Sequence, residues 1–239
     1  ILEKKGISKR EIGGFVKHYF TLRGGNNFSF HKKLFSLSTK IITTNYDKAF
    51  EKAIPGLQEI KAYKGKDYEL NRVKKDSVFL FKLHGCIDGI DSMVLFPSDY
   101  DGLYDDKGRE AEHALHTLRI LISNKTFLFI GTGLGDPQIN GIFKEINRIQ
   151  GIYNQKHYTI TDKPLEDSLS FLISIKVTSY TEIPEVIDQL LEMVDDNTPE
   201  DNPEYIELML LTDLVESYED EHYPIERPPL DKVVEPHLA

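Results

Sequence analysis

The feature that most constrains this fold is a series of short apolar runs, each followed at once by polar or glycine-rich residues. Short continuous apolar runs are typical of strands that are buried on both faces of a parallel sheet. Segments with apolar residues at helical spacing lie between these runs. This alternation predicts an α/β fold with a doubly wound, mostly parallel, Rossmann-like sheet. The predicted strands lie at residues 41–42, 78–81, 127–130, 158–160 and 175–177.

Helices are predicted wherever apolar residues recur every three or four positions. Ser8 and Glu11 have capping-box spacing, which predicts a helix from Ser8 to about Tyr19. A last helix is expected over about Glu204 to Val215, and this helix is apolar on most of its sides. Such a helix either packs back on the body of the protein or contacts a partner or a second copy. Further helices are predicted at residues 47–54, 115–122, 139–149 and 183–194.

Charge divides the chain into two parts. Residues 195–239 contain 14 Asp and Glu residues but two basic ones, which leaves 25 acidic and 27 basic residues in 1–194. We therefore expect a domain at residues 1–196 and an acidic helical or linker segment at residues 197–239, an appendage with its own partner surface. Neither part has the basic stripe of a protein that binds the phosphate backbone of nucleic acids, so no direct nucleic-acid binding is expected.

Composition also limits the location of the protein. No apolar run approaches the ~20 residues that a membrane-spanning helix needs, and no signal peptide is visible. Cys86 is the single cysteine, so an intrachain disulfide is excluded and a reducing, cytoplasmic setting is expected. Because the chain begins at Ile1 rather than at Met, we expect it to be a fragment of a longer protein.

A glycine-rich turn, Gly131-Thr132-Gly133-Leu134-Gly135-Asp136-Pro137, joins a predicted strand to a predicted helix. Glycines allow a phosphate to approach the backbone, and a helix N-terminus attracts negative charge. Asp136 stands where the dinucleotide-binding fingerprint has its third glycine. Because a carboxylate repels phosphate, Asp136 is expected to cap the helix or to meet a ribose hydroxyl. By itself the turn fits either a tight strand-to-helix connection or a ligand-binding loop.

A second polar motif, Thr43-Thr44-Asn45-Tyr46-Asp47, follows the first predicted strand. The amide of Asn45 offers both donors and acceptors, which suits a carboxamide or sugar hydroxyls. In the other interpretation, Asn45 shapes the turn and Asp47 caps the helix that runs to Ile54.

A third motif, Lys82-Leu83-His84-Gly85-Cys86, places a histidine just after another strand. The pKa of a histidine lies near neutrality, so His84 can act as a general base, although it can equally be structural. Cys86 is interpreted as a small buried residue rather than a nucleophile. His113 and His116 are spaced for one helix face, but no cysteine or further histidine lies near them in sequence, so no metal site is predicted.

The three motifs, in this order and at these intervals, resemble the sirtuin family, in particular the bacterial sirtuin-like domains of anti-phage defence systems. The resemblance covers roughly residues 40–194 and implies a doubly wound domain that binds NAD. It implies that Asn45 contacts the nicotinamide-bearing ribose and positions a water molecule, that His84 is the catalytic base, and that Asp47 helps to hold the carboxamide. The remaining NAD-binding residues implied in this way are Thr43, Thr44, Gly131, Thr132, Gly133, Leu134, Asp136 and Thr161.

Two departures from the family pattern bear on function. The family's Gly-Ala-Gly phosphate loop is not found before Thr43, so we expect part of the NAD site to be missing from this chain. Protein deacetylases of the family carry a zinc module with four cysteines, which one cysteine cannot build.

The missing cysteines favour metal-free hydrolysis of NAD to nicotinamide and ADP-ribose over deacylation, in the toxic effector of a defence system. The alternative is a non-catalytic module that senses NAD or ADP-ribose inside a larger assembly. A homo-oligomer or a partner defence protein is expected as well.

Overall fold

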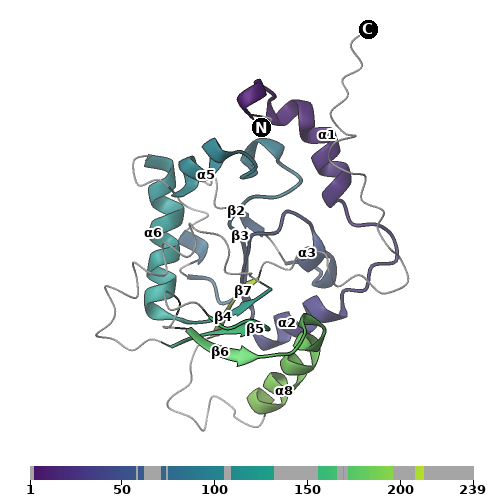
Figure 1. Cartoon of the computed structure of the whole chain (residues 1–239), viewed down its shortest axis with the longest axis vertical. Coiled ribbons are helices and arrows are strands. Elements are labelled where there is room, and N and C mark those ends of the chain that lie inside the picture. Colours follow the sequence, from purple (N-terminus) through teal and green to yellow (C-terminus); the bar gives the residue numbers. More distant parts are fainter. Residues whose placement is uncertain are drawn as a thin grey trace.

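The computed structural model describes residues 3–57, 59–61, 71–73, 75–104, 109–131, 156–165, 169, 172–195 and 208–212. These residues contain a seven-stranded parallel sheet with helices packed on it (Figure 1). The strands are β1 (Lys40–Thr43), β2 (Glu59–Lys61), β3 (Phe79–Lys82), β4 (Thr126–Ile130), β5 (His157–Thr161), β6 (Leu172–Lys176) and β7 (Leu208–Thr212). They lie in the order β2-β3-β1-β7-β4-β5-β6, and every described pair is parallel. The predicted α/β class and all five predicted strands are confirmed.

The described helices follow the expected alternation with the strands. The helix predicted from Ser8 is confirmed, since Ser8 and Glu11 form both hydrogen bonds of a capping box. The predicted helix at 183–194 is also confirmed. The helices are α1 (Lys9–Phe20), α2 (Ser29–Leu37), α3 (Ala49–Ala53), α5 (Pro97–Tyr104), α6 (Arg109–Asn124) and α8 (Ile183–Asp195), with 3-10 turns at Glu3–Lys5, Ile90–Ser92 and Tyr180–Glu182.

Both faces of the sheet are apolar and covered, with α6 on one face and α2 and α8 on the other (Figure 1). Along β4, Phe127 and Phe129 belong to the core cluster that includes α6. Leu128 and Ile130 belong to the cluster that includes α2 and α8. Successive residues of a strand point to opposite faces, so a strand covered on both faces reads as a continuous apolar run.

The side of the sheet on which the chain adds its next strands reverses between β1 and β4. The chain leaves β1 toward β2 and β3, which lie on one side, and leaves β4 toward β5 and β6, which lie on the other. Open α/β sheets bind their ligands outside the carboxyl ends of the strands at such a switch point. Thr43, Thr212 and Ile130 are register neighbours at this edge.

The prediction of a helix over about Glu204 to Val215 is wrong for the residues of this segment that the structure describes. Leu208–Thr212 form strand β7, which pairs with β1 on one side and β4 on the other. The physical reason is that the run Leu-Met-Leu-Leu is apolar at every position, a pattern that suits a strand at the centre of a parallel sheet. The division of the chain at residue 196 stays a prediction, and β7 brings five residues from beyond that point into the sheet.

Two other expectations concern helices. The helix expected at residues 139–149 lies outside the described residues. Among the helices that the structure describes, none combines the length and the apolar character needed to cross a membrane.

Candidate functional site

The carboxyl ends of β1 and β3 bring two of the predicted site residues to the same edge of the sheet. The two strands are adjacent and parallel, and Thr43 is paired in register with Lys82. Asn45 and His84 each follow this pair by two residues. A backbone hydrogen bond of 2.8 Å from Leu83 to Thr43 extends the pairing past the strand ends. Asn45 and His84 therefore directly follow the carboxyl ends of two adjacent parallel strands.

The loop after β1 is ordered by its own side chains. The hydroxyl of Thr43 accepts a hydrogen bond of 3.1 Å from the backbone N–H of Asn45. The carboxylate of Asp47 accepts one of 2.7 Å from the N–H of Ala49, the first residue of α3, and Lys48 between them is the N-cap residue of this helix. The buried hydroxyl of Thr44 has no hydrogen-bond partner within the part of the chain that the structure describes. A buried hydroxyl without a partner is costly, so Thr44 is a group that a ligand can satisfy.

His84 lies in a tight turn after β3 and is 4% exposed. Its ring makes an edge-to-face contact of 5.4 Å with the ring of Tyr100 from α5. Its carbonyl accepts a hydrogen bond of 2.9 Å from Val94. Gly85, the next residue, has a φ of +87°, which favours glycine. The imidazole is thus held by packing and by the turn on both sides of it.

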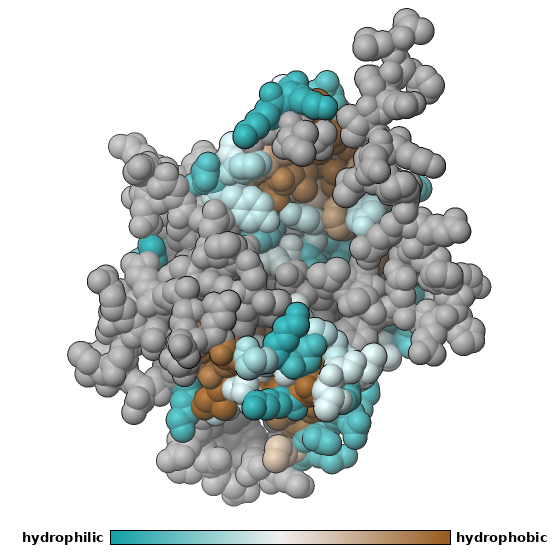
Figure 2. Space-filling view, viewed as in Figure 1, coloured by the Kyte–Doolittle hydropathy of each residue, from teal (hydrophilic) through white to brown (hydrophobic). Residues whose placement is uncertain are grey.

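The loops after β1 and β3 are bound to each other. The backbone carbonyl of Tyr46 accepts a hydrogen bond of 3.0 Å from Ile87, and its phenol donates one of 2.6 Å to the carbonyl of Val94. Helix α1 packs on the same loops through a small apolar cluster, and Figure 2 shows hydrophobic surface where α1 lies in Figure 1. Lys9 of α1 and Asp99 form an ion pair of 2.6 Å in which both side chains are nearly buried. The loop with Asn45 and the loop with His84 therefore form one packed unit.

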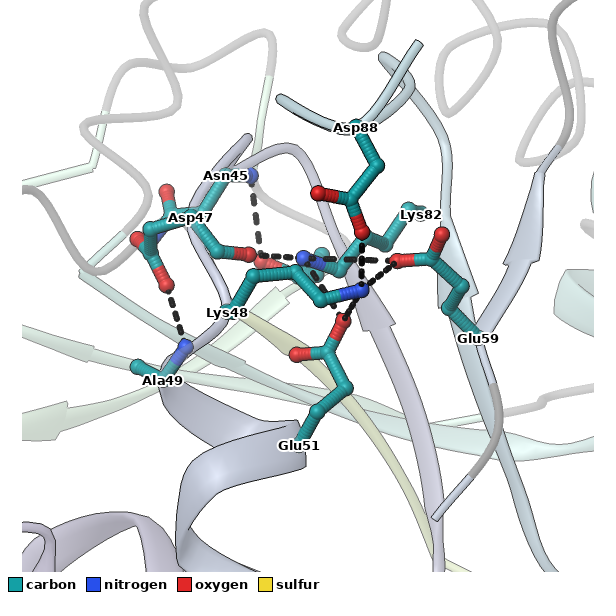
Figure 3. A network of polar contacts seen from close by, with 9 residues as sticks. Asn45, Asp47, Lys48, Ala49, Glu51, Glu59, Lys82 and Asp88 are labelled. Carbon is teal, nitrogen blue, oxygen red and sulfur yellow. Dashed lines mark hydrogen bonds and ion pairs between the residues drawn. The ribbon is translucent and has the colours of Figure 1, made fainter. Parts of the chain in front are cut away.

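A cluster of charged side chains lies directly beside the loop after β1 (Figure 3). The Lys82 side chain is 2% exposed, and its ammonium donates to the backbone carbonyl of Asp47. The same ammonium lies 3.2 Å from the Glu51 carboxylate and 3.9 Å from that of Glu59. Lys48 reaches Glu51, Glu59 and Asp88 at 3.1, 3.0 and 2.9 Å. Two ammonium groups thus share three carboxylates from α3, β2 and the loop after β3.

The pKa values in this cluster follow from burial and from the ion pairs. Burial raises the pKa of Glu51. Burial also acts to raise the pKa of Glu59, but its interactions with Glu51, Cys86 and Lys48 outweigh burial and hold that pKa at about 2. Although burial opposes it, the three carboxylates raise the pKa of Lys48 above its ordinary value. The ammonium of Lys48 lies 3.1 Å from the Glu51 carboxylate and 3.0 Å from that of Glu59, but the pKa is lowered only at Glu59.

Cys86 is fully buried, as expected for a small packing residue. Burial raises the pKa of its thiol to about 11, so the thiol is protonated at neutral pH. A protonated thiol is a poor nucleophile.

The cluster also has the spacing of a metal site. One ligand atom each from Glu51, Glu59 and Cys86 lies within 4.8 Å of the others. Lys48 and Lys82 bind the same carboxylates, so ammonium groups already neutralise the negative charge that would attract a cation. The absence of a metal stays a prediction.

Two of the remaining predicted residues, Gly131 and Thr161, are described by the structure, and both lie at the same edge of the sheet. Gly131 follows β4 directly and has a φ of +70°, so the glycine-rich turn begins in a conformation that favours glycine. Thr161 ends β5, and its hydroxyl accepts a hydrogen bond of 3.1 Å from the N–H of Lys163. Thr132, Gly133, Leu134 and Asp136 lie outside the described residues. His113 and His116 both belong to α6, as their spacing predicted.

Sequence reasoning gave no role to the charged cluster. Its members come from separate elements, and motif spacing does not show which of them meet. One signal was present, because Lys82 ends the otherwise apolar strand Phe-Leu-Phe-Lys. A lysine at the end of a fully buried strand needs partners, since an isolated buried charge is very costly.

Comparison with known proteins bears on this geometry. A family model described as the SIR2-like domain matches residues 39–180, which include the motifs after β1, β3 and β4. The chain belongs to the SIR2-like domain family. The predicted resemblance to sirtuins is thereby confirmed, and this SIR2-like chain has the doubly wound sheet expected from that resemblance.

Curated relatives of this SIR2-like chain share a common name. It is 31% identical over 147 residues to "NAD(+) hydrolase ThsA" of Enterococcus faecium, which covers 58% of this chain and 29% of that protein. It is 31% identical over 121 residues to the protein of the same name from Cytobacillus dafuensis, covering 48% and 23%. The ThsA of Bacillus cereus (strain MSX-D12) is 30% identical over 123 residues, covering 51% and 25%. The match therefore spans less than a third of the length of each of these relatives.

Proposed function

We propose that this SIR2-like chain carries the NAD-cleaving site of an NAD glycohydrolase. The observation that carries the proposal is the placement of Asn45 and His84, two residues past a register pair, at the carboxyl ends of adjacent parallel strands. These strands lie beside the switch point of the sheet, where α/β folds bind their ligands. The name of the curated relatives, NAD(+) hydrolase, supports the same reaction.

In the proposed reaction, the bond between C1′ of the ribose and the nicotinamide nitrogen breaks, and its electron pair leaves with nicotinamide. The oxygen of a water molecule forms a new bond to C1′, which yields ADP-ribose. Asn45 orients this water, and His84 accepts the proton that the water loses. A positioned base and an oriented nucleophile are the two contributions that the protein makes to such a step.

The other predicted residues are proposed to hold NAD around this centre. The buried hydroxyl of Thr44, which has no hydrogen-bond partner among the described residues, supports a ligand contact beside Asn45. Asp47 accepts a hydrogen bond from the N–H of Ala49 through one carboxylate oxygen, and we propose that the residue also helps to hold the carboxamide. Positive φ at Gly131 supports a backbone that a phosphate or ribose can approach. The complete proposed binding set is Thr43, Thr44, Asp47, Gly131, Thr132, Gly133, Leu134, Asp136 and Thr161.

The test is release of nicotinamide from NAD by the full-length protein, followed over time. His84→Ala should lower the rate by ~10²–10⁴-fold, because a general base is lost. Asn45→Ala should lower it by at least ~10²-fold, because the water is misplaced. His116→Ala, which removes an exposed histidine of α6, serves as the matched control and should keep the parental rate. Parental rates in folded His84→Ala and Asn45→Ala variants would refute the catalytic assignment.

A second candidate is a module that binds NAD or ADP-ribose without cleaving it. The absence of a Gly-Ala-Gly motif before Thr43 favours this candidate, because that loop holds the phosphates in the family. Tight binding of NAD by the full-length protein, with no release of nicotinamide under any activating condition, would decide for it.

We further propose that the protein acts in the cytoplasm as the toxic effector of an anti-phage defence system, as a homo-oligomer or with a partner protein. The acidic character of residues 197–239 supports a partner surface there. Sedimentation of the full-length protein, alone and with its candidate partners, tests this assembly.

A further inference from the structure

The buried ammonium of Lys82 is placed to hold the loop that carries Asn45. Lys82 is the last residue of β3, and its donation to the carbonyl of Asp47 crosses from β3 to the loop after β1 (Figure 3). The chain continues from Lys82 through Leu83 to His84. Lys82 therefore lies at the start of the His84 turn, and its side chain is hydrogen-bonded to the far end of the Asn45 loop.

The carboxylates around Lys82 hold its ammonium in this position. Glu51 comes from the helix that follows the loop, and Glu59 comes from the neighbouring strand β2. The contacts of Glu51 are ion pairs rather than aligned hydrogen bonds. They neutralise the charge of the Lys82 ammonium but do not set the direction in which its N–H groups point. The bond to Asp47 is then the directional contact of Lys82.

Charge in the cluster is balanced by Lys48. Lys48 and Lys82 together carry two positive charges against Glu51, Glu59 and Asp88. Asp88 is 54% exposed and so meets water as well as Lys48. The buried part of the cluster thus needs both lysines to stay neutral.

We propose that Lys82 is a positioning residue for NAD hydrolysis, because its bond to Asp47 sets the place of the Asn45 loop relative to His84. The inference rests on the proposed function for its effect on rate. It goes beyond that function because it assigns a role to a residue that touches neither the substrate nor the reacting atoms.

The alternative is that Lys82 only stabilises the fold through its ion pairs. A single and a double variant distinguish this role from the positioning role. Lys82→Met leaves the Glu51 and Glu59 carboxylates short of one counter-charge, so it should lower both the melting temperature and the rate. Lys82→Met combined with Glu51→Gln keeps the net charge of the cluster, because one ammonium and one carboxylate are lost together. Methionine has no donor for the carbonyl of Asp47. This double variant therefore restores the charge balance but lacks the hydrogen bond to the loop.

The full-length protein should show a split between folding and catalysis. In the double variant we expect the melting temperature to recover most of its loss, while kcat stays ~10²-fold low with a smaller change in KM, since misplacement of catalytic groups alone can cost that much. Lys82→Arg, which keeps a donor, should retain more of the rate than Lys82→Met. The control is Lys33→Met, which removes a 2.6 Å ion pair with Asp188, between α2 and α8, and should leave kcat unchanged. Recovery of both melting temperature and kcat in the double variant would overturn the proposal.

Hydrogen exchange gives a readout that does not depend on NAD hydrolysis. Amides of residues 44–49 should exchange faster in the double variant than in the parent, and at the parental rate in Lys33→Met. If the parental protein releases no nicotinamide, the proposed function fails, and exchange alone then decides whether Lys82 holds the loop. Unchanged exchange at residues 44–49 in the double variant would overturn the proposal in that case too.

Discussion

Replacing Gly85 by alanine should damage the site by a mechanism that can be separated from ordinary backbone strain. Gly85 follows His84 and has a φ of +87°. An alanine Cβ at this position would lie 2.4 Å from the backbone carbonyl oxygen of Ser92 and 3.0 Å from Cα of Met93. Because these contacts are backbone atoms, the segment around Ser92 has to move.

Gly56 provides a matched control for this substitution. Its φ is +88°, but a Cβ there meets nothing within 4 Å in the part of the chain that the structure describes. Positive φ at a non-glycine residue costs about 1–3 kcal/mol, so Gly56→Ala should lose about that much stability. Gly85→Ala carries the same strain and an overpacking cost of about 1–3 kcal/mol more, which gives a total of about 2–6 kcal/mol.

Melting temperature and nicotinamide release together test this reasoning. A chain of this size loses roughly 2–4 °C of melting temperature per kcal/mol, so the two variants should differ measurably. Gly85→Ala should also slow NAD hydrolysis by ~10²-fold, because the displaced segment leads into Val94, which binds the carbonyl of His84. Gly56→Ala should keep the parental rate. Equal melting temperatures for the two variants, with equal rates, would refute the reasoning.

Three further predictions follow from burial and topology. Burial lowers the pKa of His157 from 6.5 to about 4. As pH falls, the unfolded chain therefore binds a proton at this histidine before the folded chain does. About 3 kcal/mol of stability should be lost as pH falls from above 6.5 to below 4. Thermal melts across that range should show a smaller loss for His157→Asn, and equal losses would contradict the assignment. With a thiol pKa of about 11, Cys86 should react with iodoacetamide at pH 8 at least ~100-fold more slowly than a free cysteine, and mass spectrometry measures the rate. Deleting residues 197–239 removes β7, which joins β1 to β4, so cooperative thermal unfolding should be lost or sharply lowered. An unchanged melt would show that the sheet does not need β7.

The strands that support the site could be predicted because each combines a local pattern with a clear end. The runs at residues 127–130 and 78–81 are apolar throughout and stop at Gly131 and at Lys82, so both their type and their carboxyl ends are visible in sequence. The carboxyl ends of parallel strands meet at one edge, so polar residues that follow such runs, among them Asn45 and His84, lie at that edge.

Strands β2 and β7 and the charged cluster were not predicted. Strand β2 is three residues long, Glu-Ile-Lys, and its polar ends give it no apolar run. Strand β7 has a strong apolar run, but such a run fits a buried helix as well as a central strand, and pairing with β1 and β4 decides between them. The charged cluster depends on contacts between Lys48, Lys82 and carboxylates from three elements, and local spacing does not encode contacts of that kind.

Strand β7 also couples the two halves of the proposed site. Strands β1 and β4 do not pair with each other, and each pairs with β7 instead. The spacing between the Asn45 loop and the turn that begins at Gly131 is therefore set through β7. A ligand that contacts both loops favours the paired state, and by linkage it should stabilise that pairing. At 100 times its Kd the ligand contributes about 2.7 kcal/mol, so amides of residues 208–212 should exchange up to ~100-fold more slowly with NAD bound to a slowly hydrolysing His84→Ala variant. Saturating NAD that protects residues 44–49 but leaves exchange at 208–212 unchanged would show that β7 is not part of this coupling.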